Sequence, residues 1–541
     1  MTYRERERTL SAPEDWSVPV LALDGTTAEH REPLHLDALY YDTPDLRLLA
    51  HGVTLRRRTG GDDAGWHLKL PAPGDARDEL RRPLGADAQA LPTVLPGPAG
   101  TPVPPEELTR LVVGLARGDT LVPVARVRTE RRTTVLRRTG DDDAPLVEVA
   151  EDKVATERVA PPGARAHPTN TAPHAGETGA WREIEVELAP AGLGTDDPEA
   201  LLAAVVDALV AAGASEEPGG PKLARALGAP HDAGRPRTAG AGRRTRKATT
   251  AGEVVVAYLR EQVDALVRRD PEVRRDVPDA VHRSRVAARR LRSALATFRP
   301  VLDRDATEPV REELAWWGRV LGEARDAEVA RDRVHDVLER LPEELVVGPV
   351  RARVVDELDA RYRDALRGAV AQMSERRYLD LLTSLEAIAA TPPLTDGASA
   401  PAADVLPSLA RKAWKRTRRR ARAAAAADGP RREELLHDVR KAAKRARYAG
   451  EAMSGVIGKD AGRFARRFEA VQDALGDHHD AVALGRDLRA LGMQANLSGE
   501  NGFSYGLLVG IERQRADRAL EEHEVAWARA RRGRYRRWTR A

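Results

Sequence analysis

The spacing of apolar residues changes once along this 541-residue chain, and that change limits its possible folds more than any single motif does. Over roughly the first 230 residues, short segments alternate between apolar and polar side chains, which is the period of a β-strand. From residue 251 onward the chain has the pattern of long helices. Residues 228–250 (GAPHDAGRPRTAGAGRRTRKATT) lie between the two patterns and have linker composition. We therefore expect a strand-rich domain over residues 1–228, a flexible linker over 229–250 and a helical domain over 251–541.

Composition excludes several classes of protein. The chain has no cysteine, which excludes disulfides, thiolate zinc sites and a cysteine nucleophile. No apolar run approaches the roughly 18 residues that a membrane-spanning helix needs. Residues 1–10 are charged and lack the apolar segment of a secretory signal. We therefore expect a cytoplasmic protein that does not span a membrane.

The two halves of the chain differ in charge. Residues 1–250 contain 32 Lys and Arg against 38 Asp and Glu, a net charge of −6, and the remaining residues contain 56 against 46, a net charge of +10. The surplus is densest over residues 411–447, where 15 basic residues accompany four acidic ones. Such a surplus favours polyanionic partners for the second half.

Short strands with turn residues between them predict an antiparallel sheet or a closed barrel in the first half. Two further segments, 105–117 and 198–212, have helical patterns, and residues 159–180 have the composition of a long loop. The expected strands cover residues 3–10, 37–42, 53–59, 65–70, 121–130, 132–138, 146–150 and 182–188.

Several of these strands carry charged residues at i and i+2, which places both on one face of the strand. If that face is interior, it forms a polar tunnel in which Arg and Lys hold phosphates and paired carboxylates hold Mg²⁺ or Mn²⁺. The alternative for any single pair is a solvated strand face. The pairs are Glu5 with Glu7, Arg56 with Arg58, Arg126 with Arg128, and Glu185 with Glu187, while Glu148 shares its face with Asp152.

The first 228 residues resemble a CYTH domain, the domain of the triphosphate tunnel metalloenzymes. The motifs YRERE, YYDTPDLRLLAHGVTLRRR, GWHLKLP, RDE, PVARVRT, LVEVAEDKV, WREIEVEL and PKLARAL follow in the order of that family. The resemblance implies an eight-stranded antiparallel β tunnel that binds a triphosphate with a divalent metal. Members of the family include inorganic triphosphatases, thiamine triphosphatases and a class of adenylyl cyclase.

The resemblance also implies the roles of individual residues. The metal-site and catalytic carboxylates would be Glu5, Glu7, Glu148, Asp152, Glu185 and Glu187. The phosphate-binding residues would be Arg56, Arg58, Lys69, Arg126, Arg128 and Lys222, with Arg77 and Glu79 as a further charged pair.

One position departs from the family pattern. The family signature is E-x-E-x-K, whereas this chain reads Glu5-Arg6-Glu7-Arg8-Thr9, so Thr9 occupies the lysine position. Arg8 has the wrong strand parity to replace that lysine unless a bulge shifts the register. The pattern predicts that one phosphate-binding cation is missing, which bears on turnover more than on binding. There is no G-x-x-x-x-G-K-[ST] loop, which excludes a P-loop NTPase.

The second half contains a duplication. Aligning His282 with His437 also pairs Arg285 with Arg440, and the downstream segments LGEARDAEV and LGDHHDAV align as well. In each copy, a histidine and basic residues at i, i+3, i+7 and i+10 line one helix face. A row of cations this dense repels itself unless anions lie along it. The alternative is a solvated arginine-rich helix paired with acids on neighbouring helices.

These paired motifs resemble a CHAD domain, the conserved histidine α-helical domain that often follows CYTH. The resemblance implies two pseudo-symmetric four-helix bundles, about 251–395 and 405–541, with a basic surface that binds inorganic polyphosphate. Asp326 and Asp480 would orient arginines, and we do not expect a metal site at His478-His479-Asp480 because consecutive helical positions diverge. The implied anion contacts are His282, Arg285, Arg289, Arg292, His437, Arg440, Lys441, Lys444, Arg445 and Arg447, with Arg290 beside them.

Two functional hypotheses follow, and a third is weaker. The first is a metal-dependent inorganic triphosphatase, using Mg²⁺ or Mn²⁺ to hydrolyse tripolyphosphate to pyrophosphate and phosphate, with a polyphosphate-binding helical domain. The second is a weakly catalytic or non-catalytic polyphosphate-binding protein, because of Thr9. Nucleic acid is a less favoured partner, since 4% aromatic residues offer little base stacking. We expect a cytoplasmic location associated with polyphosphate granules. No motif indicates an oligomeric state.

Overall fold

The computed structural model describes residues 2–5, 7–13, 16–21, 23, 25–72, 76–85, 101–139, 144–159, 178–216, 222–228 and 250–540. These residues form two compact units, Met1–Ala241 and Gly242–Ala541. The predicted linker lies outside the described residues except for its last residue, and so does most of the predicted loop at 159–180.

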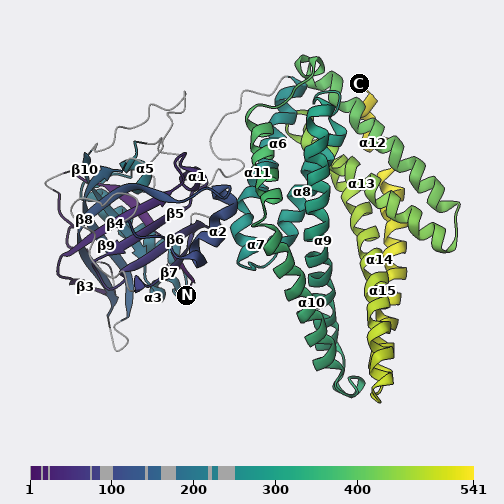
Figure 1. Cartoon of the computed structure of the whole chain (residues 1–541), viewed down its shortest axis with the longest axis horizontal. Coiled ribbons are helices and arrows are strands. Elements are labelled where there is room, and N and C mark those ends of the chain that lie inside the picture. Colours follow the sequence, from purple (N-terminus) through teal and green to yellow (C-terminus); the bar gives the residue numbers. More distant parts are fainter. Residues whose placement is uncertain are drawn as a thin grey trace. The chain divides into compact units, whose positions relative to one another are not determined.

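The first unit is built around one antiparallel sheet of ten strands (Figure 1). The strand order is β1-β7-β6-β5-β4-β8-β9-β10-β2, and β3 pairs with β8. The strands are β1 (Thr2–Glu5), β2 (Glu7–Ser11), β3 (Thr26–His30), β4 (Leu34–Asp42), β5 (Thr54–Thr59), β6 (Gly65–Pro71), β7 (Arg77–Arg82), β8 (Val122–Arg138), β9 (Pro145–Arg158) and β10 (Thr178–Leu188).

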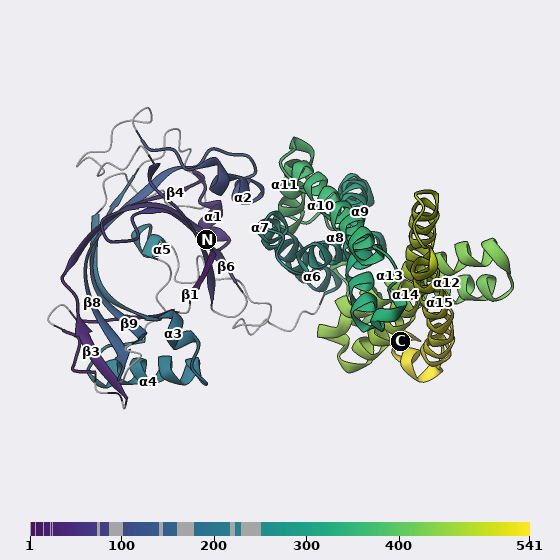
Figure 2. The same cartoon turned by 90° about the horizontal axis from the view of Figure 1, so that it is seen from below.

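The sheet curls because its two ends belong to the same stretch of chain. β1 pairs with β7 at one end of the strand order and β2 pairs with β10 at the other, although Arg6 alone separates β1 from β2 in sequence. Figure 2 shows the curl and the short helix α5 (Lys222–Ala226) on its concave side. The expected antiparallel tunnel architecture is therefore confirmed, with ten strands in place of eight.

Two predicted strands merge, the predicted strand at residues 3–10 divides into β1 and β2, and two strands were not predicted. Residues 121–138, expected as two strands, form the single strand β8. β3 (TTAEH) is mostly exposed and β7 (RDELRR) carries charge on both faces, so neither shows apolar alternation.

Apolar residues cover both faces of the curled sheet. On the convex face, Ile184, Val186 and Leu188 of β10 pack with Leu202 and Val206 of α4 (Pro198–Ala211). On the concave face, apolar residues of β4, β8 and β9 pack against α5. The remaining helices of this unit are α1 (Arg47–Ala50), α2 (Glu106–Ala116) and α3 (Pro190–Leu193). The polar part of the concave face lies beside α5.

The second unit is helical throughout, which confirms the predicted all-α domain. A capping box of Thr250 and Glu253 begins its first helix. None of the described helices combines the length and apolar character needed to cross a membrane. The helices are α6 (Ala251–Arg268), α7 (Asp270–Arg274), α8 (Ala280–Thr297), α9 (Arg304–Arg340), α10 (Val350–Gln372), α11 (Arg376–Ala390), α12 (Ala402–Ala425), α13 (Gly429–Ile457), α14 (Lys459–Leu497) and α15 (Phe503–Ala530), with 3₁₀ helices η3 (Glu343–Leu345), η4 (Asp396–Ser399) and η5 (Gly533–Arg540).

The duplicated segments occupy equivalent helices. α8 and α9 carry the first copy of the motifs, and α13 and α14 carry the second. The copies also share a core, because Val334 and Val354 of α9 and α10 pack with Leu484 and Leu508 of α14 and α15. α8 contacts α13 directly, so the two motif-bearing helices are neighbours.

Candidate functional site

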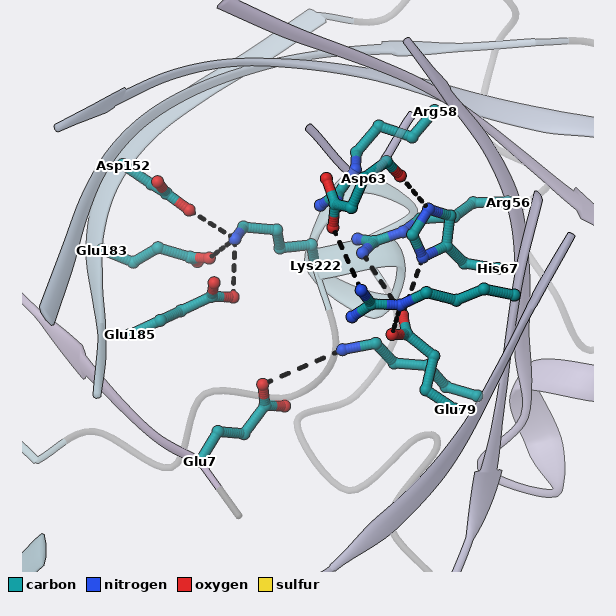
Figure 3. A network of polar contacts seen from close by, with 12 residues as sticks. Glu7, Arg56, Arg58, Asp63, His67, Glu79, Asp152, Glu183, Glu185 and Lys222 are labelled. Atoms are coloured by element: carbon teal, nitrogen blue, oxygen red, sulfur yellow. Dashed lines mark hydrogen bonds and ion pairs between the residues drawn. The ribbon is translucent and has the colours of Figure 1, made fainter. Parts of the chain in front are cut away.

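Three carboxylates converge on the concave face of the curled sheet. Asp152 of β9 is fully buried and lies opposite Glu183 of β10, with Glu185 two residues further along the same face. One carboxylate oxygen from each lies within 4.8 Å of the others. Lys222, the first residue of α5, places its Nζ among them, 2.6 Å from Asp152, 2.9 Å from Glu183 and 2.6 Å from Glu185 (Figure 3).

A second cation supports this cluster from the neighbouring strand. Arg131 of β8 donates to Asp152 at 2.7 and 2.8 Å and also to Glu185. Burial alone would raise the pKa of Glu185, but the charges of Lys222 and Arg131 hold it well below its usual value. Burial would likewise lower the pKa of Lys222, and the carboxylates raise it well above its usual value instead. Glu185 and Lys222 are therefore both charged at neutral pH.

A basic wall faces these carboxylates across the interior (Figure 3). It is formed by Arg56 and Arg58 of β5 and by His67 and Lys69 of β6, with Glu79 of β7 among them. His67 Nδ1 lies 2.8 Å from a Glu79 oxygen, and Arg56 lies 3.9 Å from it. Lys69 lies 4.0 Å from Glu7.

The cations of this wall weaken one another's charged forms. Burial, followed by the charges of Arg56 and Arg131, lowers the pKa of Arg58 to about 9. Burial lowers the pKa of His67 to about 4. Burial would raise the pKa of Glu79, but its hydrogen bond with His67 and the charge of Lys69 lower it instead. An anion with several oxygens would be bound favourably along such a wall.

Arg126 and Arg128 do not join the basic wall, which corrects our expectation for them. Ala125 and Val127 of the same strand pack against α5, so the intervening arginines point to the convex face. There Arg126 donates to Asp37 at 2.9 Å. Arg128 lies 3.7 Å from Glu157. β8 contributes Arg131 to the interior in their place.

The other expected acidic residues lie along the sheet away from the cluster. Glu187 is opposite Glu148 on one side and Glu7 on the other. Glu148 forms an ion pair with Arg31 at 3.5 Å.

Glu5 and Arg77 are the last two of the expected site residues in the sheet. They are direct partners in the register of β1 and β7, and the Glu5 side chain lies outside the described residues.

Thr9 lies next to the carboxylate cluster. It is the register partner of Glu185, whereas Arg8 points away and pairs with Glu199 of α4 at 3.5 Å. Arg8 therefore does not supply the cation that the family signature places at position 9.

Sequence reasoning missed Glu183, Arg131 and His67. Glu183 was detectable, because it continues the spacing of Glu185 and Glu187 by two residues. Arg131 lies in a run of charged residues that places arginines on both faces of the strand, so the run did not indicate which arginine points inward. His67 is flanked by apolar residues and carried no signal beyond its polarity.

The helical unit brings basic side chains of both copies together. Arg285 of α8 donates to Asp326 at 2.8 Å, and Arg289 donates to the Tyr448 hydroxyl of α13 at 2.6 Å. Burial and the neighbouring charges of Arg440 and Arg289 hold the pKa of Lys444 well below its usual value. In the part of the chain that the structure describes, neither Arg440 nor Lys444 forms an ion pair. We call Arg285, Arg289, Arg440 and Lys444 the basic face.

Four of the remaining predicted cations fall into two groups, one paired with carboxylates and one surrounded by other cations. Arg290 and Arg447 share Glu451, at 3.1 and 2.6 Å, and Arg447 also lies 2.7 Å from Glu469, so two carboxylates offset the two charges. Burial, then Arg416 and Arg292, lower the pKa of Arg445. Arg292 and Arg445 thus extend the run of like charges.

Lys441 differs from these two groups, because its side chain is largely exposed and lies 4.0 Å from Asp438.

The duplicated histidines border the basic face in the neutral form. Burial, then Lys441 and His479, lower the pKa of His437 to about 4. Burial, then Arg325, also lower the pKa of His282. His478 points elsewhere and bonds to Glu433 at 2.8 Å, so these histidines form no metal cluster among the described residues.

The sheet cluster suits a divalent cation. Carboxylate oxygens are the ligands that Mg²⁺ and Mn²⁺ prefer. The Lys222 ammonium already stands in the position of a cation among all three. Asp152, Glu183 and Glu185 therefore fit a metal ion if Lys222 gives up that position.

Comparisons with known proteins agree with this division. The CYTH domain family matches residues 4–225 and the CHAD domain family matches residues 257–489. An uncharacterized protein of Mycobacterium tuberculosis, MT2285, is 36% identical over 496 residues, covering 91% of this chain and 89% of its own length. Among solved structures, PptA from Streptomyces chartreusis is 25% identical, covers 52% of this chain and 100% of its own, and has a TM-score of 0.44. The CHAD domain from the plant Ricinus communis is 25% identical, covers 51% and 93%, and has a TM-score of 0.41.

Proposed function

The chain belongs to the family of proteins in which a CYTH domain is followed by a CHAD domain, and we propose that it binds inorganic phosphate chains in both domains. The sheet domain would hydrolyse tripolyphosphate to pyrophosphate and phosphate with Mg²⁺ or Mn²⁺. The helical domain would bind polyphosphate along the basic face. We also propose a cytoplasmic location associated with polyphosphate granules.

The observation that carries the proposal is the opposition of the carboxylate cluster and the basic wall across one interior. Arg56, Arg58 and Lys69 would hold phosphate oxygens, while Asp152, Glu183 and Glu185 would hold the metal. A metal there would offset charge that develops on the phosphate oxygens during cleavage. No side-chain nucleophile is needed, because a carboxylate can orient the attacking water.

The residues around the cluster would prepare it for the reaction. Arg131 fixes Asp152 by two hydrogen bonds and so holds one carboxylate in place. Lys222 would turn from the carboxylates to the phosphate oxygens once a metal is bound. Both residues would then contribute positive charge next to the phosphoanhydride.

The helical half of the proposal is supported by Arg440 and Lys444, two partly buried cations that form no ion pair among the described residues. Holding Arg440 and Lys444 beside the arginines of α8 costs free energy, because like charges repel and burial removes water from them. A chain of phosphates laid along the basic face would offset that cost. The neutral His282 and His437 at its border would donate hydrogen bonds to the same anion.

The test is phosphate release from tripolyphosphate by the purified chain with Mg²⁺, with Mn²⁺ and with EDTA. Glu185→Gln should abolish metal-dependent release and leave polyphosphate binding by the helical domain intact, because Glu185 lies in the sheet cluster. Release that survives Glu185→Gln unchanged would show that the cluster is not the active site.

The position of Thr9 supports a second candidate, a tunnel that retains binding and has lost turnover. Thr9 faces Glu185, where the family signature has a cation. In the same assay, release gained only in Thr9→Lys would identify the parent chain as chiefly a polyphosphate binder. Competition between polyphosphate and RNA for the helical domain would separate both candidates from nucleic-acid binding.

A further inference from the structure

A third group of basic residues lies outside both sites, where α14 begins and η5 ends the described chain. It lines a cavity of ≈ 530 Å³. Arg534 and Tyr535 lie in η5, beyond residues 257–489 that match the CHAD family. The lining residues, which we call the arginine pocket, are Asp460, Arg463, Arg466, Arg467, Arg534 and Tyr535.

Aromatic packing holds η5 in place beside α14. The Trp538 ring meets the ring of Phe464 edge-on, with 5.6 Å between their centroids. Arg536 lies over the ring of Trp414 of α12, 4.0 Å from its centroid. Because these contacts hold the residues that directly follow Tyr535 against α14 and α12, they fix one wall of the pocket.

Two arginines converge on the Tyr535 side chain. Arg467 and Arg534 donate to its hydroxyl at 3.1 and 2.8 Å. Their guanidinium groups also lie 4.7 and 4.8 Å from the centroid of its ring. A phenol is neutral near pH 7 and does not compensate two guanidinium charges. Tyr535 therefore orients these arginines without neutralising them.

The pocket is short of negative charge. Among the described residues that line it, Asp460 alone carries a carboxylate, which lies 3.3 Å from Arg463. Within the described ranges, Arg466, Arg467 and Arg534 pair with no carboxylate. The first turn of the 39-residue helix α14 adds the partial positive charge of a helix N-terminus. The arrangement suits an anion that carries two or three negative charges.

We propose that the arginine pocket binds a short phosphoanhydride of two or three phosphates, either free or as the end of a nucleoside triphosphate. Guanidinium groups bind phosphate oxygens in pairs, and three arginines directed into one cavity match several such oxygens. The cavity is larger than one phosphate requires. The site shares no residue with the tunnel or the basic face and does not rest on the function proposed for either.

The test is hydrogen–deuterium exchange on the full chain, with EDTA present so that no metal-dependent turnover occurs. Pyrophosphate, tripolyphosphate and ATP are titrated separately, and protection is followed in peptides covering residues 459–467 and 533–540. We expect protection of both segments. In the double variant with Arg466→Ala and Arg534→Ala, the ligand concentration that gives half-maximal protection should rise at least about tenfold. The reason is that charged hydrogen bonds to the ligand are lost.

Two controls separate this pocket from other anion sites. Arg431→Ala removes an arginine whose exposed side chain pairs with Glu434, and it should leave the protection unchanged. Arg285→Ala with Arg440→Ala should also leave it unchanged. Protection by ATP alone would identify a nucleotide as the source of the phosphoanhydride. Absence of protection with all three probes, or protection that survives in the Arg466→Ala and Arg534→Ala variant, would overturn the proposal.

Because Arg466 is exposed and makes no described contact, Arg466→Ala alone tests the proposal without a folding defect. This single variant should weaken protection in the same direction, by a smaller factor. Unchanged protection in Arg466→Ala would remove Arg466 from the site.

Discussion

The tunnel and the basic face use similar side chains in opposite ways. In the tunnel, the buried cations Arg131 and Lys222 lie against carboxylates. On the basic face, Arg440 and Lys444 lie against other cations, and burial leaves their charged forms disfavoured. The charges of these tunnel cations are therefore offset by carboxylates of the protein, and a ligand must displace existing ion pairs in order to bind. The basic face carries a surplus of positive charge, and a bound polyanion would reduce the repulsion between its cations.

The largest expected difference is in stability. Asp152→Asn removes the charge of a fully buried carboxylate, so Arg131 and Lys222 lose a charged partner, and we expect the free energy of unfolding of the sheet domain to fall by roughly 3–5 kcal/mol. Asp326→Asn removes the partner of Arg285, but 71% of the Asp326 side chain is exposed, and we expect less than about 1 kcal/mol. Urea unfolding of both variants measures the contrast. Equal losses would contradict internal neutralisation of the tunnel.

The next effect concerns polyphosphate affinity. Arg285→Ala with Arg440→Ala should weaken polyphosphate binding about a hundredfold, because two charged hydrogen-bonding groups are lost. The same change should leave the thermal midpoint equal or higher, because it relieves repulsion. Titration with polyphosphate and thermal unfolding test both points, with Arg431→Ala as the matched control. Unchanged affinity would remove these arginines from the binding surface.

The third effect concerns the metal. Lys222→Met retains most of the side-chain volume and removes the cation that competes for Asp152, Glu183 and Glu185. We expect Mn²⁺ to bind about tenfold more tightly, because the carboxylates no longer have to release an ammonium group. Mn²⁺ titration followed by electron paramagnetic resonance measures this. Lys153→Met, on the surface beside Glu130, is the control, and weaker binding in Lys222→Met would show that the lysine assists the metal.

Binding of a polyanion to the basic face should be coupled to proton uptake by His437 at its border. The folded free protein holds the pKa of His437 at about 4, below the usual 6.5, so the unfolded state binds more protons between these values and folded stability falls as pH drops through them. A bound polyanion favours the imidazolium form and raises that pKa. We expect affinity to rise a few-fold from about pH 7.5 to about pH 5.5. Calorimetry in buffers of different ionisation enthalpy should show proton uptake, reduced in His437→Gln.

The smallest effect distinguishes the two copies of the repeat. A Cβ at Gly476 would lie 3.0 Å from Arg440, whereas a Cβ at Gly322 would lie 3.5 Å from Arg285. Gly476→Ala should therefore displace its arginine and weaken polyphosphate binding about twofold, and Gly322→Ala should not. Both changes should favour the helix by up to about 1 kcal/mol. Equal affinities in the two variants would show that Arg440 adapts without cost.

The fold class followed from the sequence because periodicity reports directly on secondary structure. Alternation in β10 and the three-to-four-residue spacing in α8 and α13 are local properties. The sequence also predicted which residues share one face of a strand, because side chains two residues apart in a strand lie on the same face. Glu185 and Glu187 are such a set, and so are Arg56 and Arg58.

Only the tertiary structure decided which face each set occupies and which sets meet. Both faces of β8 carry charged as well as apolar residues. Whether Arg126 or Arg131 points into the interior therefore depended on which face of the strand packs against α5. Lys222 reaches carboxylates that are 37 or more residues away in sequence, and Lys444 meets arginines more than 150 residues away. The sequence by itself determined the elements and the polarity of their faces. Packing determined the neighbours, because contacts between distant segments depend on how whole elements bury their apolar surfaces.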